Sequence, residues 1–136
     1  MSRTSAVAAA ALLVVATLLV AGCGGTDEAA PARLLAPEEF ATAITEPGRV
    51  TINVHLPDEG SLEGTDLWIP FDAVGVRRDE LPSPSTPLAV YCRSGRMSAI
   101  AVETLSRLGY DDIVELGGGM VAWERGGRRL LPPRGS

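Results

Sequence analysis

The sequence predicts a single α/β domain with a central, mainly parallel β-sheet and helices on both faces. Two short apolar runs carry this prediction, residues 50–54 and Leu88–Tyr91. Neither run alternates strongly with polar residues, which is typical of strands covered on both faces of a parallel sheet. The full length of 136 residues is enough for one such domain and too short for two separate cores.

Residues 1–22 are interpreted as a lipoprotein signal peptide that is not part of the domain. Arg3 supplies a small positive charge, and residues 6–21 form an apolar run that is short for a membrane span. The run ends in Leu-Val-Ala-Gly-Cys at residues 19–23, which resembles the signal box of bacterial lipoproteins. We therefore expect lipidation of Cys23 to anchor the protein in the lipid bilayer of the cell membrane, on the extracytoplasmic side. An ordinary signal peptide, or an uncleaved anchor with an incidental cysteine, is the alternative.

Residues 23–33 are small and polar and include a proline, which predicts a flexible tether. The domain is expected to span residues 34–133, followed by a short tail at 134–136, and the whole segment 125–136 is predicted to be loose. The first helix is expected to start at Pro37, because proline is favoured at the first helical position and two glutamates follow. Its buried face should hold Phe40, Ala43 and Ile44.

The central feature of the sequence follows the second apolar run and reads Cys-Arg-Ser-Gly-Arg-Met-Ser at residues 92–98. The chain must curl here to pass from a buried strand into a helix, and Gly95 allows backbone angles that other residues avoid. The curl is expected to turn successive N–H groups inward before Ser98 caps the helix. Converging amides at a helix N-terminus form a site of positive potential.

Cys92 is therefore the predicted nucleophile, because this environment favours a thiolate over a thiol. The predicted anion-binding residues are Arg93, Ser94, Gly95, Arg96, Met97 and Ser98. With Cys23 lipidated, Cys92 is the only thiol left, so no intramolecular disulfide is possible. The alternative is a buried, inert cysteine at the end of a strand.

Asn53 and His55 close the first apolar run, and the carboxyl ends of parallel strands meet at one edge of a sheet. We expect these two residues to share the edge with Cys92 as accessory site residues. His55, the only histidine, is a candidate for proton transfer or for donation to an anion, and a structurally hydrogen-bonded imidazole is the alternative.

The segment between the two runs contains an acidic loop at residues 57–66, which is interpreted either as a gate, docking surface or metal clip or as a solvated connection. Its carboxylates lack regular ligand spacing, so no metal site is predicted. Trp68 is expected to pack in the core or at the rim, and residues 72–81 are predicted to form a short helix with Asp72 as N-cap.

After the reactive loop, apolar residues at helical spacing predict a helix that ends at Gly109. Residues 113–116 are the last predicted strand, and the three glycines at 117–119 are expected to allow close packing beside the loop.

Residues 92–98 and 109–123 together resemble the rhodanese, or sulfurtransferase, family. Its loop reads roughly Cys-x-x-Gly-x-Arg followed by a small residue, which Cys92, Gly95 and Ser98 match. Met97 stands where many members carry arginine, and an arginine precedes it as Arg96. Residues 109–123 are similar to the closing pattern of the family, a Gly-aromatic turn, a strand, Gly-Gly and a helix with an inward tryptophan.

The resemblance implies a rhodanese-like fold over residues 34–133 and sulfur transfer through a persulfide on Cys92. The implied partners are a small anionic sulfur donor such as thiosulfate and an acceptor that is a thiol, cyanide or a protein. No metal or organic cofactor is implied. Many members have Asp-Val-Arg where this chain has Asn-Val-His at residues 53–55, which removes a usual ion pair.

Three other classes of function are alternatives to sulfur transfer. A non-catalytic rhodanese-like docking module at the membrane surface would tolerate the departures at Met97, Asn53 and His55. A phosphatase or arsenate-type reductase also uses a thiolate in an anion site, but the cysteine-phosphatase pattern needs arginine six positions after the cysteine, where this chain has Ser98. A structural lipoprotein would not need Cys92. The formal net charge of −5 argues against a nucleic-acid partner. The oligomeric state is left open, with a monomer as the simplest expectation.

Overall fold

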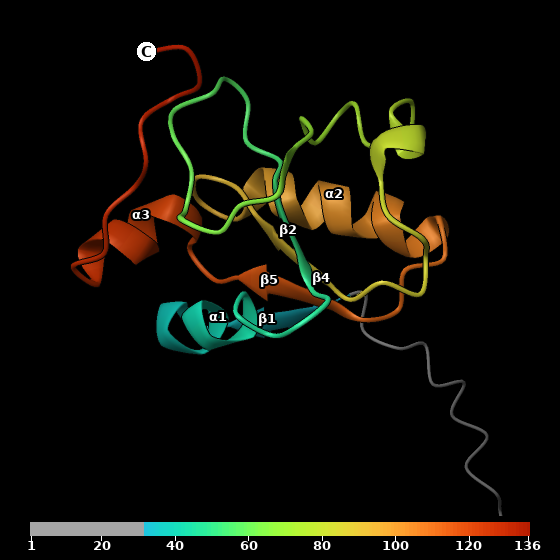
Figure 1. The fold of residues 1–136 in the computed structure, drawn as a ribbon, viewed down its shortest axis with the longest axis horizontal. Helices are drawn as coiled ribbons and strands as arrows, with labels where there is room; N and C mark the ends of the chain where they lie inside the picture. The colour runs from blue at the N-terminus through green and yellow to red at the C-terminus, as the bar shows by residue number, and fades with distance from the viewer. Residues whose placement is uncertain (1–31) are drawn as a thin grey trace, which may run out of the picture.

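The computed structural model describes residues 32–136, which form a five-stranded sheet flanked by three α-helices (Figure 1). The strands are β1 (Arg33–Leu35), β2 (Val50–Asn53), β3 (Leu67–Trp68), β4 (Leu88–Tyr91) and β5 (Ile113–Leu116). The helices are α1 (Pro37–Ala43), α2 (Arg96–Arg107) and α3 (Gly119–Arg125), with a 3₁₀ turn, η1, at Arg78–Glu80. The predicted signal peptide, Cys23 and most of the predicted tether lie outside the described residues.

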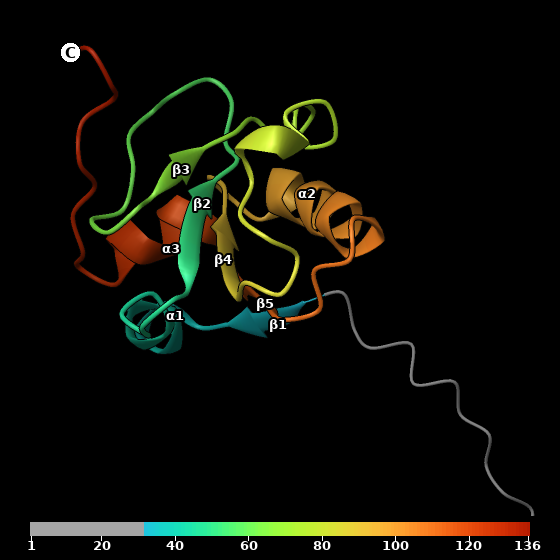
Figure 2. The ribbon, with the colours of Figure 1, turned by 45° about the vertical axis from the view of Figure 1, so that its right-hand side comes forward.

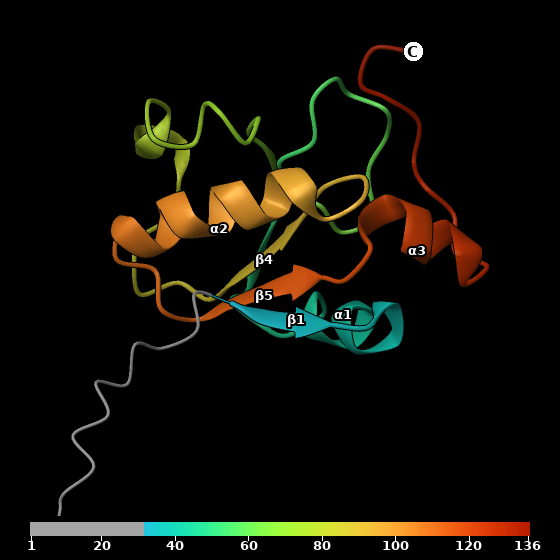
Figure 3. The same cartoon turned by 180° about the vertical axis from the view of Figure 1, so that it is seen from behind.

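The sheet has the strand order β1-β5-β4-β2-β3, and every neighbouring pair is parallel. This confirms the predicted α/β class. Strand β4 lies at the centre, and all four of its residues are buried. Asn53 is in register with Tyr91, and Val90 with Glu115, so the carboxyl ends of β2, β4 and β5 lie at one edge. Figure 2 shows the common direction of β2 and β4, and Figure 3 that of β4 and β5. The loop that begins at Cys92 leaves the sheet from this edge.

Helix α2 covers one face of the sheet, and α1 lies on the opposite face (Figure 3). The core on the α2 face includes Ile52, Val90, Ala101 and Leu105. The core on the other face includes Phe40, Tyr91, Val114, Met120 and Trp123, so α3 shares that layer with α1. No helix within residues 32–136 is long and apolar enough to cross a membrane.

Two boundaries differ from the sequence prediction. Arg33 was assigned to the tether, but it begins the edge strand β1 and is in register with Val114 of β5. Residues 72–81 form turns and the short η1 instead of a helix capped by Asp72. Gly75 and the β-branched Val74 and Val76 disfavour helix there, and the bond from the Arg77 N–H to the Ala73 carbonyl is not continued into a helix.

The C-terminal segment is also more ordered than predicted. Leu131 exchanges backbone hydrogen bonds with Ser61, at N···O distances of 2.7 and 3.1 Å. The Trp123 indole N–H donates to the Arg129 carbonyl, and the Asp58 carboxylate accepts from the Arg134 N–H. The sequence pattern missed the contacts of Leu131 with Ser61 and of Arg134 with Asp58 because each joins segments that are distant in the chain.

Arg49 links the amino-terminal ends of three strands. Its guanidinium is 4% exposed and donates to the Leu88 carbonyl at 3.0 Å. It also pairs with Glu46 at 2.8 Å and with Asp112 at 3.3 Å. Because a buried carbonyl and two carboxylates share this one side chain, its loss removes several interactions together.

We predict that Arg49→Ala lowers the free energy of unfolding by about 2 kcal/mol, since it leaves the Leu88 carbonyl without its charged donor. Urea unfolding measures the effect. The control is Arg78→Ala, whose side chain is 70% exposed and is expected to change stability by less than about 0.5 kcal/mol. Equal effects of the two substitutions would contradict the assigned role of Arg49.

Candidate active site

The side chain of Cys92 lies at the start of the loop between β4 and α2, folded back against the loop's own backbone. The Gly95 N–H donates to the Cys92 sulfur at an N···S distance of 3.0 Å. Gly95 has a φ of +107°, in the region that favours glycine, and helix α2 begins at the next residue. The sulfur therefore lies at the N-terminus of a helix of 12 residues, where unpaired N–H groups and the helix dipole favour negative charge.

Ser98 is not the helix cap that the sequence predicted. Gly95 occupies the N-cap position, because its left-handed conformation lets the helix start three residues earlier. Ser98 lies in the first turn and is fully buried. Its hydroxyl donates to the Gly95 carbonyl at 3.0 Å and lies 2.6 Å from a carboxylate oxygen of Glu115 and 3.4 Å from the Cys92 sulfur. Ser98 thus connects the thiol to a carboxyl group.

The first turn of α3 holds the other side of the loop. The Met120 and Val121 N–H groups donate to the Cys92 and Arg93 carbonyls at 2.9 and 3.0 Å. Because a trans peptide points its N–H away from its carbonyl, the N–H groups that follow these carbonyls face away from α3. The contact therefore determines which side of the loop presents its amides.

Gly119 makes this contact possible. Its φ is +59°, and a Cβ at this position would lie 2.4 Å from the Cys92 carbonyl oxygen and 2.5 Å from the Arg93 carbonyl carbon. Both the backbone angle and the close approach exclude a larger side chain. The expectation of close packing at the glycines beside the loop is confirmed at this residue.

The thiol of the candidate site is buried, and charged side chains lie at the rim. Cys92 is 1% exposed, whereas the side chains of Arg93 and Arg96 are exposed. Arg93 pairs with Glu59 of the loop between β2 and β3, at an N···O distance of 3.4 Å. A hydrogen bond from His55, together with the charge of Arg93, holds the pKa of Glu59 below its usual value. The sequence indicates Glu59 only as one residue of the acidic loop at 57–66 and does not predict its contact with Arg93.

His55 and Asn53 lie at the predicted edge of the sheet. In the part of the chain that the structure describes, neither forms a hydrogen bond with the Cys92 thiol. The His55 Nε2 contacts the Glu59 carboxylate, and its main-chain carbonyl accepts from the Trp68 indole N–H at 2.8 Å. The Asn53 amide accepts from the His55 N–H and donates to the Gly60 carbonyl, each at 2.9 Å. Both side chains fix the course of the loop after β2.

Glu115 is the site residue that sequence reasoning missed. It lies in β5 with Leu34 and Val90 as its neighbours in the sheet, and it accepts the Ser98 hydrogen bond. Burial raises the pKa of this carboxyl group, and the hydrogen bond from Ser98 acts in the opposite direction. A single acidic residue inside an otherwise apolar strand was the available signal.

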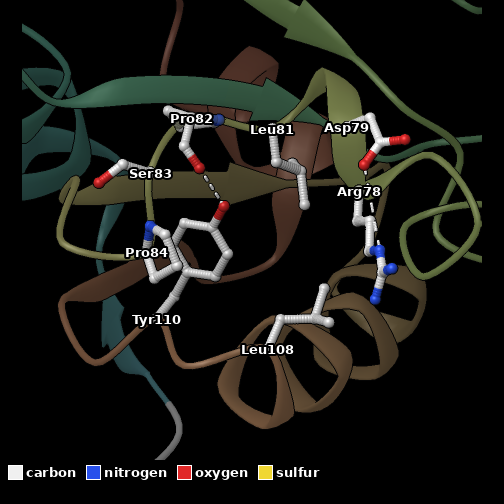
Figure 4. A pocket seen from close by; sticks show the side chains of 8 residues that line it. All are labelled: Arg78, Asp79, Leu81, Pro82, Ser83, Pro84, Leu108 and Tyr110. Atoms are coloured by element: carbon white, nitrogen blue, oxygen red, sulfur yellow. Dashed lines mark hydrogen bonds and ion pairs between the residues drawn. The ribbon is translucent and has the colours of Figure 1, made fainter.

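No group of three His, Cys, Asp or Glu side chains within residues 32–136 is arranged to hold a metal ion. A surface cavity is found at the opposite edge of the sheet, among segments that precede β4 and β5 (Figure 4). Its lining includes Leu81, Pro82, Leu108 and Tyr110, whose hydroxyl donates to the Pro82 carbonyl. This cavity is separate from the thiol, and its lining contains no cysteine.

The fold and the loop together define a class: a small parallel α/β domain that presents one cysteine between its central strand and a helix N-terminus. The chain belongs to the rhodanese-like domain family, whose model matches residues 36–125.

Individual relatives agree with this assignment. A sulfurtransferase of Allochromatium vinosum is 35% identical over 69 residues, which cover 51% of this chain and 64% of that protein, less than two-thirds of its length. A rhodanese-related protein from Thermoplasma volcanium is 28% identical with a TM-score of 0.62, covering 73% of this chain and 97% of that one. A rhodanese-like domain protein from Staphylococcus aureus is 25% identical with a TM-score of 0.56, covering 67% and 90%. The family and the sulfurtransferase relative support a sulfurtransferase-family role.

We predict that Gly119→Ala destabilises the protein by roughly 2 kcal/mol or more, because the added methyl group would meet the Cys92 and Arg93 backbone. Urea unfolding measures this effect. Gly127→Ala is the matched control, since Gly127 also has a positive φ, +83°, but open space around its Cβ position. It should show only the backbone cost of about 1 kcal/mol. Equal losses in the two variants would show that the close approach at Gly119 has no energetic weight.

Proposed function

We propose that this domain is a sulfurtransferase that carries a sulfane sulfur as a persulfide on Cys92. The observation that carries the proposal is the placement of the Cys92 sulfur, 3.0 Å from the Gly95 N–H at the N-terminus of α2. A thiolate and a persulfide are both anions, so one set of backbone donors stabilises the enzyme before and after loading. The rhodanese-like family and the sulfurtransferase relative support the same chemistry.

The proposed reaction has two displacement steps. In the first, the Cys92 thiolate attacks the outer sulfur of a donor such as thiosulfate, a new S–S bond forms, and sulfite leaves with the electron pair of the broken S–S bond. In the second, an acceptor thiol, cyanide or a protein removes the outer sulfur and returns the thiolate. The backbone N–H groups of residues 93–98 are proposed to stabilise the persulfide. No metal or organic cofactor takes part in this scheme.

Mass spectrometry after treatment with thiosulfate tests the proposal. We expect the peptide that contains Cys92 to gain the mass of one sulfur atom, and cyanide to remove this gain. The Cys92→Ser protein should show no gain while unfolding at the same urea concentration as the unmodified protein. A gain that persists in Cys92→Ser would refute the role of this residue.

The alternative is a docking module without turnover, which the departures at Met97, Asn53 and His55 favour. In that case thiosulfate leaves the mass of the Cys92 peptide unchanged. The same measurement therefore separates the two functions.

The two arginines of the rim are proposed to attract and orient the anionic donor. Arg93 is paired with Glu59. Among residues 32–136, no ion pair at the rim includes Arg96. Arg96 should therefore contribute more of the free positive charge that a donor meets.

We predict that Arg96→Ala slows sulfur loading from thiosulfate by on the order of tenfold, because it removes that charge, and slows loading from a neutral trisulfide much less. The measured quantity is the rate at which the Cys92 persulfide appears. Arg78→Ala, beside the cavity at the opposite edge, is the control and should leave both rates unchanged. An equal loss with both donors would argue against charge steering.

The proposed location is the extracytoplasmic face of the cell membrane, with acyl chains on Cys23 as the anchor. The sequence at residues 19–23 supports this proposal. We predict that Cys23→Ala releases the protein from isolated membranes into the soluble fraction and leaves sulfur loading of Cys92 unchanged. Retention of the variant in the membrane fraction would contradict a lipid anchor at this residue.

A further inference from the structure

Three side chains form a hydrogen-bonded chain that runs from the loop into the sheet. The Cys92 sulfur lies 3.4 Å from the Ser98 hydroxyl oxygen, which lies 2.6 Å from a carboxylate oxygen of Glu115. Cys92 and Ser98 are 1% and 0% exposed, so bulk water has little access to the first link. The chain connects a buried thiol to a partly buried acid by way of one hydroxyl group.

The number of hydrogens on these three side chains limits which of their hydrogen bonds can form at the same time. Two oxygens at 2.6 Å need a hydrogen between them, supplied either by Ser98 or by a protonated Glu115. If Ser98 donates to the Glu115 carboxylate, its single hydrogen is used, and Cys92 can take part only as a thiol that donates to Ser98. If a protonated Glu115 donates to Ser98, the Ser98 hydrogen is released from the carboxylate and can turn from the Gly95 carbonyl, 3.0 Å away, to stabilise a Cys92 thiolate. The protonation states of the two end groups are therefore coupled.

We propose that Glu115 is a positioning residue that takes up the proton of Cys92 through Ser98. In this step the thiol proton moves to the Ser98 oxygen while the Ser98 proton moves to a Glu115 oxygen. One S–H bond breaks, one carboxyl O–H bond forms, and Ser98 is regenerated. The negative charge moves from the carboxylate to the sulfur, and the total number of protons is unchanged.

The surroundings of Glu115 favour this exchange. Its neighbours across β1 and β4 are Leu34 and Val90, both apolar. The buried residues of α2 are Ser98, Ala101, Val102 and Leu105, so this helix turns no charged group inward. Glu59, His55 and Arg93 form their network at the rim, and Arg33 of β1 pairs with Asp112. Helices α1 and α3 lie on the opposite face of the sheet.

This environment also makes Glu115 easier to protonate than an exposed carboxyl group. Burial raises the pKa of Glu115, with Ser98 opposing, and the packing residues named above offer no cation to hold it ionised. A carboxyl group and a thiol that can exchange a proton titrate as a coupled pair, in two macroscopic steps.

This inference deepens the proposed function, since a thiolate is the attacking species in sulfur transfer, but its test uses no sulfur donor. Thiolate absorbance near 240 nm is followed against pH in the full chain carrying Cys23→Ala, with the Cys23→Ala and Cys92→Ser double variant subtracted. Removal of Cys23 leaves Cys92 as the only thiol in the sequence.

We expect the Cys92 thiolate signal to develop in two steps. The lower step reports the thiolate beside a protonated Glu115, and the upper step reports both groups ionised. With Glu115→Gln, the signal should collapse to a single step, about one pH unit below the upper step, because the like charge within hydrogen-bonding reach is gone. Glu103→Gln, an exposed carboxylate on the outer side of α2, is the matched control and should keep both steps.

A Glu115→Gln titration that superimposes on the parent curve would overturn the proposal. Ser98→Ala gives a second, independent test, because it keeps Glu115 but removes the bridging hydroxyl. The lower step should then disappear, and its persistence would also overturn the proposal. Two coupled steps in a protein that forms no persulfide would leave the relay intact and refute the proposed sulfur transfer. Persulfide formation in a protein without two coupled steps would support the proposed sulfur transfer and refute the relay.

Discussion

The candidate site depends on the contact between the first turn of α3 and the loop after β4. Two hydrogen bonds, at 2.9 and 3.0 Å, fix the carbonyls of Cys92 and Arg93 toward the helix. Planar trans peptides then place the following N–H groups on the other side of the loop. Gly119 permits the approach, since any Cβ there would overlap the loop backbone. One packing contact between helix and loop therefore also sets the electrostatic character of the site.

The site separates its polar groups into two layers. The inner layer consists of Cys92, Ser98 and Glu115 on the α2 side of the sheet, in which Cys92 and Ser98 are shielded from water and Glu115 is partly buried. The outer layer is the network of Arg93, Glu59 and His55, in which carboxylate charge offsets part of the positive charge at the rim. In the proposed function, the inner layer governs ionisation of the thiol, and the outer layer governs attraction of an anionic donor. The Glu59 contact reduces the contribution of Arg93 and leaves Arg96 as the more available cation.

The departures from the rhodanese pattern have specific structural consequences. Met97, at the position where many members carry arginine, is partly buried against the α2-side core. Asn53 satisfies the His55 N–H and the Gly60 carbonyl, so uncharged hydrogen bonds hold the loop after β2. Both changes exchange charge for neutral packing or hydrogen bonding.

The sequence by itself determined the α/β class, the first helix, the central strands and the place of Cys92 at the end of the central strand, because these follow from local periodicity, proline and glycine positions and the spacing of short motifs. It failed at residues 72–81, where helix-like composition was overridden by Gly75 and its β-branched neighbours. It also missed the pairing of Leu131 with Ser61. Only the tertiary structure decided that Ser98 bridges the thiol to Glu115 and that Glu59 joins Arg93 to His55. The contacts of Ser98 with Glu115 and of Glu59 with Arg93 join segments that are far apart in the chain. They depend on strand register and helix packing, which side-chain spacing in a single sequence does not encode.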